Sequence, residues 1–203
     1  MDFHQIFPTV IGQLNCEMSN EILLDIDSLV NADFEVHEYY NFIVSKDKGI
    51  LNTTPRLKAL ILNYVHEYAR KVLNLNKKMK VTQSWVTKQD EKSSIFPHRH
   101  QNSIISGSFY LNAKENQSGI TFYKDNVFRE NYIDWVDINE TNQYNYTDVT
   151  LSCKTGTLIL FPSYLKHSVV ENINNQNRLS LAFNTWFDEP IGMWENLNYL
   201  GVQ

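Results

Sequence analysis

The sequence has few of the residues that build disulfide-rich, fibrous or membrane-spanning proteins. Only 2 cysteines occur in 203 residues, and Cys16 and Cys153 lie far apart without a CxxC spacing, so neither a disulfide framework nor a cysteine-bound zinc site is indicated. The 7 glycines and 5 prolines are too few for a fibrous or low-complexity chain. No apolar run approaches the ~18 residues that a membrane helix needs, and the start of the chain lacks a signal-peptide pattern. These absences favour a globular protein of the reducing cytoplasm.

Positive charge is also scarce, because 18 Lys and Arg face 23 Asp and Glu, which gives a formal net charge of −5. The densest basic run, at residues 76–80, is short. Nucleic-acid-binding proteins normally concentrate positive charge on one face, so duplex nucleic acid is not expected as a partner. The apolar content of 42% is sufficient for the core of one domain over residues 1–203.

Hydrophobic periodicity predicts two helices in the N-terminal segment, residues 1–79. Residues 19–30 carry apolar side chains on one helical face, with Ser19 available as the N-cap. A second helix is predicted from Thr54 as the cap and Pro55 in the first turn to about Asn74.

After residue 79 the pattern changes to short runs of alternating or β-branched residues, which are typical of strands. The predicted strands are residues 80–87, 103–112, 119–123, 148–153, 157–161, 168–172 and 178–187. This pattern predicts a β-rich sandwich or jelly roll with a core at about residues 80–187, whose outer face the helices cover. The aromatic-containing polar stretch 127–146 is either a lid over the barrel mouth or a loop packed by its aromatic side chains.

Three histidines have positions that suit a metal site. His98 and His100 are two residues apart just before an apolar strand, so extended backbone would direct both imidazoles the same way. His167 follows another predicted strand and a bend. Two histidines at one strand mouth and one at a second form a facial triad, which leaves coordination positions open for substrate and oxygen.

Arg178 opens the apolar strand 178–187, so its guanidinium points either into the barrel or out to water. A buried guanidinium requires an anion. A bound dicarboxylate is a natural candidate, because the planar fork of arginine matches a carboxylate bidentately.

These residues lie in an ordered set of motifs that resembles the 2-oxoglutarate/iron(II)-dependent dioxygenase superfamily. The set reads HxH at His98–His100, SGxxYL from Ser106, FPSxxxH from Phe161 to His167, and RxS at Arg178–Ser180. The resemblance covers about residues 85–184 and is especially close to a branch of small oxygenases that also carries HxH. It implies a double-stranded β-helix of the cupin-like, jelly-roll type.

The resemblance also implies the roles of individual residues. His98, His100 and His167 would bind Fe(II), with His100 in the position where the superfamily usually has Asp or Glu. Arg178 would bind the distal carboxylate of 2-oxoglutarate, with Ser180 and Tyr110 as supporting hydroxyl groups. The implied reaction hydroxylates a substrate and releases succinate and CO2.

Other interpretations remain open at this level. An acidic residue elsewhere could complete the metal site, Tyr110 could be a core tyrosine, and Trp85, Phe122 and Phe161 are expected to pack inside the barrel. A three-histidine cupin dioxygenase without 2-oxoglutarate, or a jelly-roll binding module, would carry the same residues. The substrate, a prolyl or other protein side chain or a small molecule, is not specified by the sequence. The aromatic stretch 186–199 is compatible with a homodimer interface or with a strap across the barrel.

Overall fold

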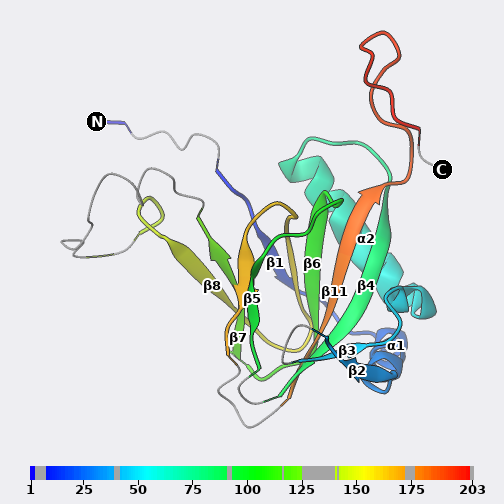
Figure 1. Ribbon diagram of the computed structural model, residues 1–203, viewed down its shortest axis with the longest axis vertical. Helices are drawn as coiled ribbons and strands as arrows, with labels where there is room; N and C mark the ends of the chain where they lie inside the picture. Colours follow the sequence, from blue (N-terminus) through cyan, green and yellow to red (C-terminus); the bar gives the residue numbers. More distant parts are fainter. Residues whose placement is uncertain are drawn as a thin grey trace.

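The fold consists of two facing β-sheets with two helices on the outside of the larger sheet (Figure 1). The computed structural model describes residues 1–2, 8–38, 42–90, 93–115, 117–124, 140, 142–171 and 177–201. The larger sheet contains, in spatial order, β1 (Gly12–Asn15), β9 (Thr157–Pro162), β6 (Ile105–Asn112), β11 (Arg178–Phe187), β4 (Met79–Gln89), β3 (Ile43–Ser45) and β2 (Phe34–Val36). The smaller sheet contains β5 (Ile95–His98), β10 (His167–Val169), β7 (Gln117–Tyr123) and β8 (Asp148–Cys153).

Neighbouring strands within both sheets are antiparallel, and strands distant in sequence lie side by side. The last strand, β11, runs between β6 and β4, which confirms the predicted double-stranded β-helix. All seven predicted strands are present. The sequence pattern did not indicate the short strands β1, β2, β3 and β5, because three or four residues are too few to show a period.

Both predicted helices form, and they cover the outer face of the larger sheet (Figure 1). In α1 (Asn20–Val30) the Ser19 hydroxyl accepts from the Ile22 N–H, as expected of an N-cap. Thr54 occupies the predicted N-cap position of α2 (Pro55–Val72), but its side chain makes no cap hydrogen bond. Asp25 of α1 caps α2 instead: its Oδ2 accepts from the backbone N–H groups of Arg56 (3.0 Å) and Leu57 (2.9 Å).

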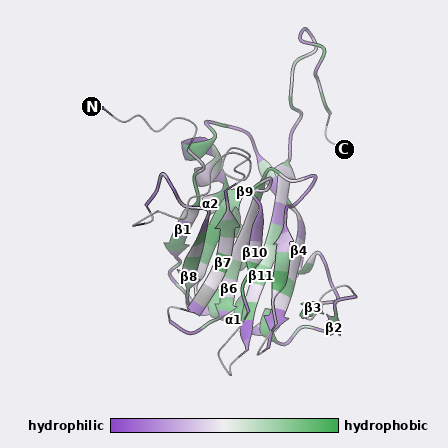
Figure 2. Cartoon of the chain, turned by 60° about the vertical axis from the view of Figure 1, so that its left-hand side comes forward, coloured by the Kyte–Doolittle hydropathy of each residue, from purple (hydrophilic) through white to green (hydrophobic). Residues whose placement is uncertain are grey.

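Strand alternation produces two separate apolar cores. Leu179, Leu181 and Phe183 of β11 pack toward the helices, whereas Ser180 and Ala182 line a cavity between the sheets. Figure 2 shows the hydrophobic residues concentrated in the strands. At Gly107 of β6 the backbone approaches Phe183 so closely that an added Cβ would lie 2.3 Å from the ring. One face of the larger sheet therefore packs against the helices, and the other face lines the cavity.

The structure bears differently on the two aromatic-containing segments, residues 127–146 and 186–199. Most of the stretch 127–146 lies outside the described residues, so its role as a lid stays a prediction. The tail after β11 is not a strap: it extends beyond the end of the sheet (Figure 1), and Trp194 is 72% exposed. Its use in a homodimer stays a prediction. Neither helix in the described part of the chain is long and apolar enough to span a membrane.

Candidate metal and cosubstrate site

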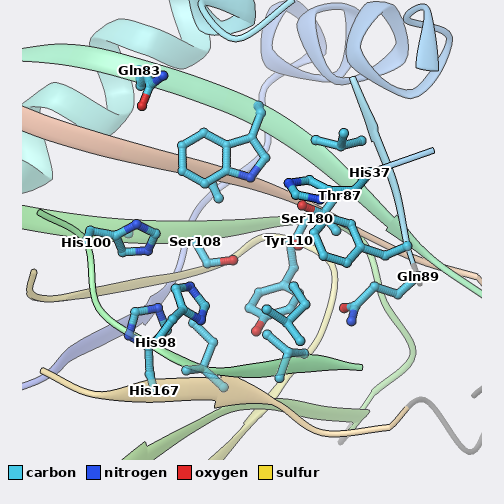
Figure 3. Close-up of a pocket in the computed structure, with 18 of the residues that line it drawn as sticks. His37, Gln83, Thr87, Gln89, His98, His100, Ser108, Tyr110, His167 and Ser180 are labelled. Atoms are coloured by element: carbon cyan, nitrogen blue, oxygen red, sulfur yellow. The ribbon is translucent and has the colours of Figure 1, made fainter. Parts of the chain in front are cut away.

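A cavity of about 310 Å³ lies between the two sheets. On the larger sheet it is lined by residues of β4, β6, β9 and β11, and on the smaller sheet by residues of β5, β7 and β10. Figure 3 shows three histidines gathered at one end and Tyr110, Ser180 and Gln89 toward the other. We call these the metal end and the anchor end.

The metal end brings together the three predicted histidines. Their candidate ligand atoms all lie within 4.8 Å of one another. His98 ends β5 and His167 begins β10, and the two are register partners across an irregular antiparallel pair. Their ring centroids are 4.4 Å apart, and those of His98 and His100 are 5.1 Å apart.

Backbone carbonyls fix two of the imidazoles. Nδ1 of His98 lies 2.8 Å from the carbonyl oxygen of Phe96, and Nδ1 of His167 lies 2.8 Å from that of Leu165. Because a carbonyl can only accept, each Nδ1 carries the proton and each Nε2 presents its lone pair, which is the usual arrangement of a metal-binding histidine. His100 is held through its backbone N–H, which donates to the Ser163 carbonyl at 3.0 Å.

Burial also favours the metal-binding form of two of these side chains. Together with the neighbouring imidazoles, it lowers the pKa of His100 to about 3 and that of His167 to about 4. Neutral imidazole is the form that binds metal. Among the described residues no Asp or Glu joins the cluster. Three neutral nitrogen donors at the end of a cavity fit a divalent transition metal with open coordination positions.

At the anchor end, Arg178 is 1% exposed, so the alternative of a solvent-exposed turn arginine was wrong. Its Nε and Nη2 donate to Oε1 of Gln89 at 3.1 and 2.7 Å. Burial lowers the pKa of Arg178, while nearby Tyr110 and Cys153 raise it. A guanidinium inside a protein is costly and favours a bound anion.

Tyr110 and Ser180 line the cavity toward the end at which Gln89 lies (Figure 3). They are register partners on β6 and β11. Tyr110 is 1% exposed and belongs to the core between the sheets, so the packing interpretation also applies to it, and burial raises the pKa of its phenol. All three predicted cosubstrate-binding residues therefore lie at or beside one cavity.

Several cavity-lining residues were not predicted from the sequence. Thr87 and Gln89 of β4 and Ser108 of β6 line the cavity. Trp85 was expected only to pack in the barrel, yet it lines the cavity with its ring centroid 5.9 Å from that of His100. Since side chains alternate along a strand, an inward Trp85 would have indicated Thr87 and Gln89.

Comparison with known families decides among the interpretations. Residues 83–184, just over half of the chain, match the family described as "Putative 2OG-Fe(II) oxygenase". The chain belongs to this 2OG-Fe(II) oxygenase family. Its cofactors are iron(II) and 2-oxoglutarate. No curated protein matched the chain.

Solved structures of 2OG-Fe(II) oxygenases share the fold at low sequence identity. An oxidoreductase of this family from Burkholderia pseudomallei has a TM-score of 0.62 at 14% identity, covering 86% of this chain and 83% of its own. HygX from Streptomyces hygroscopicus, solved with nickel and 2-oxoglutarate bound, has a TM-score of 0.58 at 12% identity, covering 87% and 82%. A prolyl-4-hydroxylase from Pseudomonas putida has a TM-score of 0.57 at 11% identity, covering 88% and 92%.

Proposed function

We propose that this oxygenase is a hydroxylase in which His98, His100 and His167 bind Fe(II) and Arg178 binds the distal carboxylate of 2-oxoglutarate. One observation supports the proposal most: the three imidazoles line one end of a single cavity, and Gln89, which binds the Arg178 guanidinium, lines the other. A dicarboxylate that spans this cavity would place its 2-oxo acid end at the metal. When bound, iron and 2-oxoglutarate supply the oxidation, with release of succinate and CO2.

The chain itself supplies position and an environment of low polarity. Nδ1–H of His98 and Nδ1–H of His167 stay on their carbonyl acceptors, which keeps both Nε2 atoms directed at the metal. Arg178 and the hydroxyls of Tyr110 and Ser180 orient the cosubstrate from the far end. Beside the histidines, the ring of Phe161, 4.7 Å from that of His167, and the ring of Trp85, 5.9 Å from that of His100, help to exclude water.

The substrate is proposed to offer an aliphatic carbon to the metal end. The support is the apolar lining there, which suits an uncharged C–H group. A prolyl or other protein side chain and a small molecule both meet this requirement. Figure 3 places His37 at the cavity wall, away from the histidine cluster, where it could contact the rest of such a substrate.

Anaerobic titration tests the proposal. Iron(II) is added to the chain, 2-oxoglutarate follows, and the visible charge-transfer band of the chelate is recorded. We expect a band that decays when oxygen is admitted, together with formation of succinate. Iron binding without a band, or oxygen consumption that needs an organic substrate but no 2-oxoglutarate, would contradict the proposal and favour three-histidine dioxygenase chemistry.

A further inference from the structure

The anchor end contains a buried pair of unlike side chains. Arg178 and Gln89 are register partners on β11 and β4, and each is only 1% exposed. A single oxygen, Oε1 of Gln89, accepts from both Nε and Nη2 of Arg178. Two hydrogen bonds from one edge of a planar group fix both its plane and its direction.

Unlike an ion pair, the Arg178–Gln89 pair has a net positive charge. Gln89 is neutral, so it orients the guanidinium without cancelling its charge. Tyr110 and Cys153 are two polar groups that also influence Arg178. Burial raises the pKa of the Tyr110 phenol and raises that of the Cys153 thiol to about 11, so both are neutral near pH 7.

We infer that Gln89 is a positioning residue that sets cosubstrate selectivity: it fixes the orientation of the Arg178 guanidinium beside the cavity and adds no negative charge of its own that would oppose the second carboxylate of 2-oxoglutarate. This inference rests on the proposed use of 2-oxoglutarate. Gln89 also lines the cavity, so its side chain lies where the distal carboxylate of the cosubstrate would bind.

A carboxylate at position 89 would reverse this effect. Glutamate has nearly the shape of glutamine and could accept the same two hydrogen bonds, now charge-assisted. Beside Arg178 it would stay ionised. It would neutralise the guanidinium and repel the distal carboxylate of 2-oxoglutarate, while a 2-oxo acid with a methyl group at that end would lose little.

The test compares two 2-oxo acids on the intact chain. Dissociation constants for 2-oxoglutarate and for 2-oxopentanoate, which has a methyl group in place of the distal carboxylate, are measured anaerobically with Fe(II) from the charge-transfer band. In Gln89→Glu we expect the preference for 2-oxoglutarate to fall at least ~10-fold, through weaker 2-oxoglutarate binding, with 2-oxopentanoate binding changed less than ~3-fold.

Gln83→Glu is the matched control. It makes the same change on the same strand and also adds a carboxylate to the cavity lining, but away from Gln89 (Figure 3). We expect its preference to stay within about 3-fold of the wild-type value. A second variant, Gln89→Leu, removes the acceptor without adding charge and should also weaken 2-oxoglutarate binding, because the guanidinium is no longer oriented.

The outcomes separate the two proposals. If Gln89→Glu kept the wild-type preference for 2-oxoglutarate, or if Gln89→Leu bound 2-oxoglutarate as tightly as the wild type, the role of Gln89 would be overturned. The proposed function would not be affected. An equal fall of the 2-oxoglutarate preference in Gln83→Glu would also overturn the role of Gln89, because a carboxylate anywhere in the cavity lining would then have the same effect. A wild-type chain that binds iron but neither 2-oxo acid would overturn the proposed function and this inference with it.

Discussion

The two ends of the cavity are built in different ways. At the metal end the side chains come from the short strands β5 and β10 and the loop after β5, and His98 and His167 each bond a carbonyl two residues earlier in the chain. At the anchor end Arg178 and Gln89 meet through the long antiparallel pair of β11 and β4. Local contacts therefore orient the proposed metal ligands, and sheet register orients the proposed cosubstrate anchor.

This comparison predicts that changes at the two ends have separable effects. Metal-end changes should lower iron affinity, and anchor-end changes should lower 2-oxoglutarate affinity at unchanged iron affinity. Changes on the helical side of the larger sheet should affect stability alone.

The largest effect is expected for His167→Ala. It removes one of three neutral nitrogen donors, so iron(II) affinity should fall more than ~100-fold, beyond the ~10–100-fold that loss of a supporting contact costs. Iron affinity is measured by competition with a chromogenic chelator, and succinate formation is measured in parallel.

His66→Gln is the control for His167→Ala. His66 lies on α2, where its Nε2 accepts from the Met79 N–H at 3.0 Å, and glutamine can still accept that bond. Unchanged iron affinity is expected there. Full 2-oxoglutarate turnover by His167→Ala would contradict the assignment of the metal ligands.

Arg178→Ala should come next. Loss of one partner of a buried, charged hydrogen-bonded pair costs about 2–5 kcal/mol, so 2-oxoglutarate affinity should fall on the order of 100-fold. The charge-transfer band measures this loss at fixed iron.

Two further results would show that the anchor end is separate. Iron affinity of Arg178→Ala should equal that of the wild type, and its binding of 2-oxopentanoate should change little. A parallel loss of iron binding would mean that the two ends are not independent and that the substitution disturbs the whole cavity.

A smaller effect is expected for His100→Asp. It places the carboxylate that the superfamily usually has at this position, so iron should remain bound and turnover should stay within about 10-fold of the wild type, since an anionic oxygen is a competent iron ligand. His100→Ala removes the donor without replacement and should lose far more. Equal activity of wild type, His100→Asp and His100→Ala would mean that His100 is not a ligand.

The same contrast explains what the sequence could predict. The histidine cluster could be found because HxH and the residues before His167 act within short segments. The jelly roll was also predictable, since its longer strands show clear alternation. The contact of Gln89 with Arg178 could not be predicted, because it depends on the pairing of β4 with β11. No local sequence pattern indicates that pairing.

The same reason applies to the cap of α2. Thr54 has the residue type and position of an N-cap, but the acceptor is Asp25, which lies on the other helix. Likewise, β2 and β3 are too short to show periodicity, yet they add an edge to the larger sheet and bring Val44 to the cavity. Tertiary contacts decided each of these features.

The smallest effect is expected for Asp25→Ala, which removes the acceptor for two N–H groups at the start of α2. Loss of a helix cap costs about 1–2 kcal/mol of unfolding free energy, and for a chain of this size each kcal/mol lowers the Tm by roughly 2–4 °C. Asp27→Ala is the matched control on the same helix, because Asp27 is exposed and its carboxylate accepts a hydrogen bond from the Asn31 side chain and from no backbone N–H in the described part of the chain. Chemical denaturation should show a loss for Asp25→Ala alone, with 2-oxoglutarate affinity unchanged in both variants. Weaker cosubstrate binding in Asp25→Ala would mean that the helical face and the cavity face of the larger sheet are coupled rather than independent.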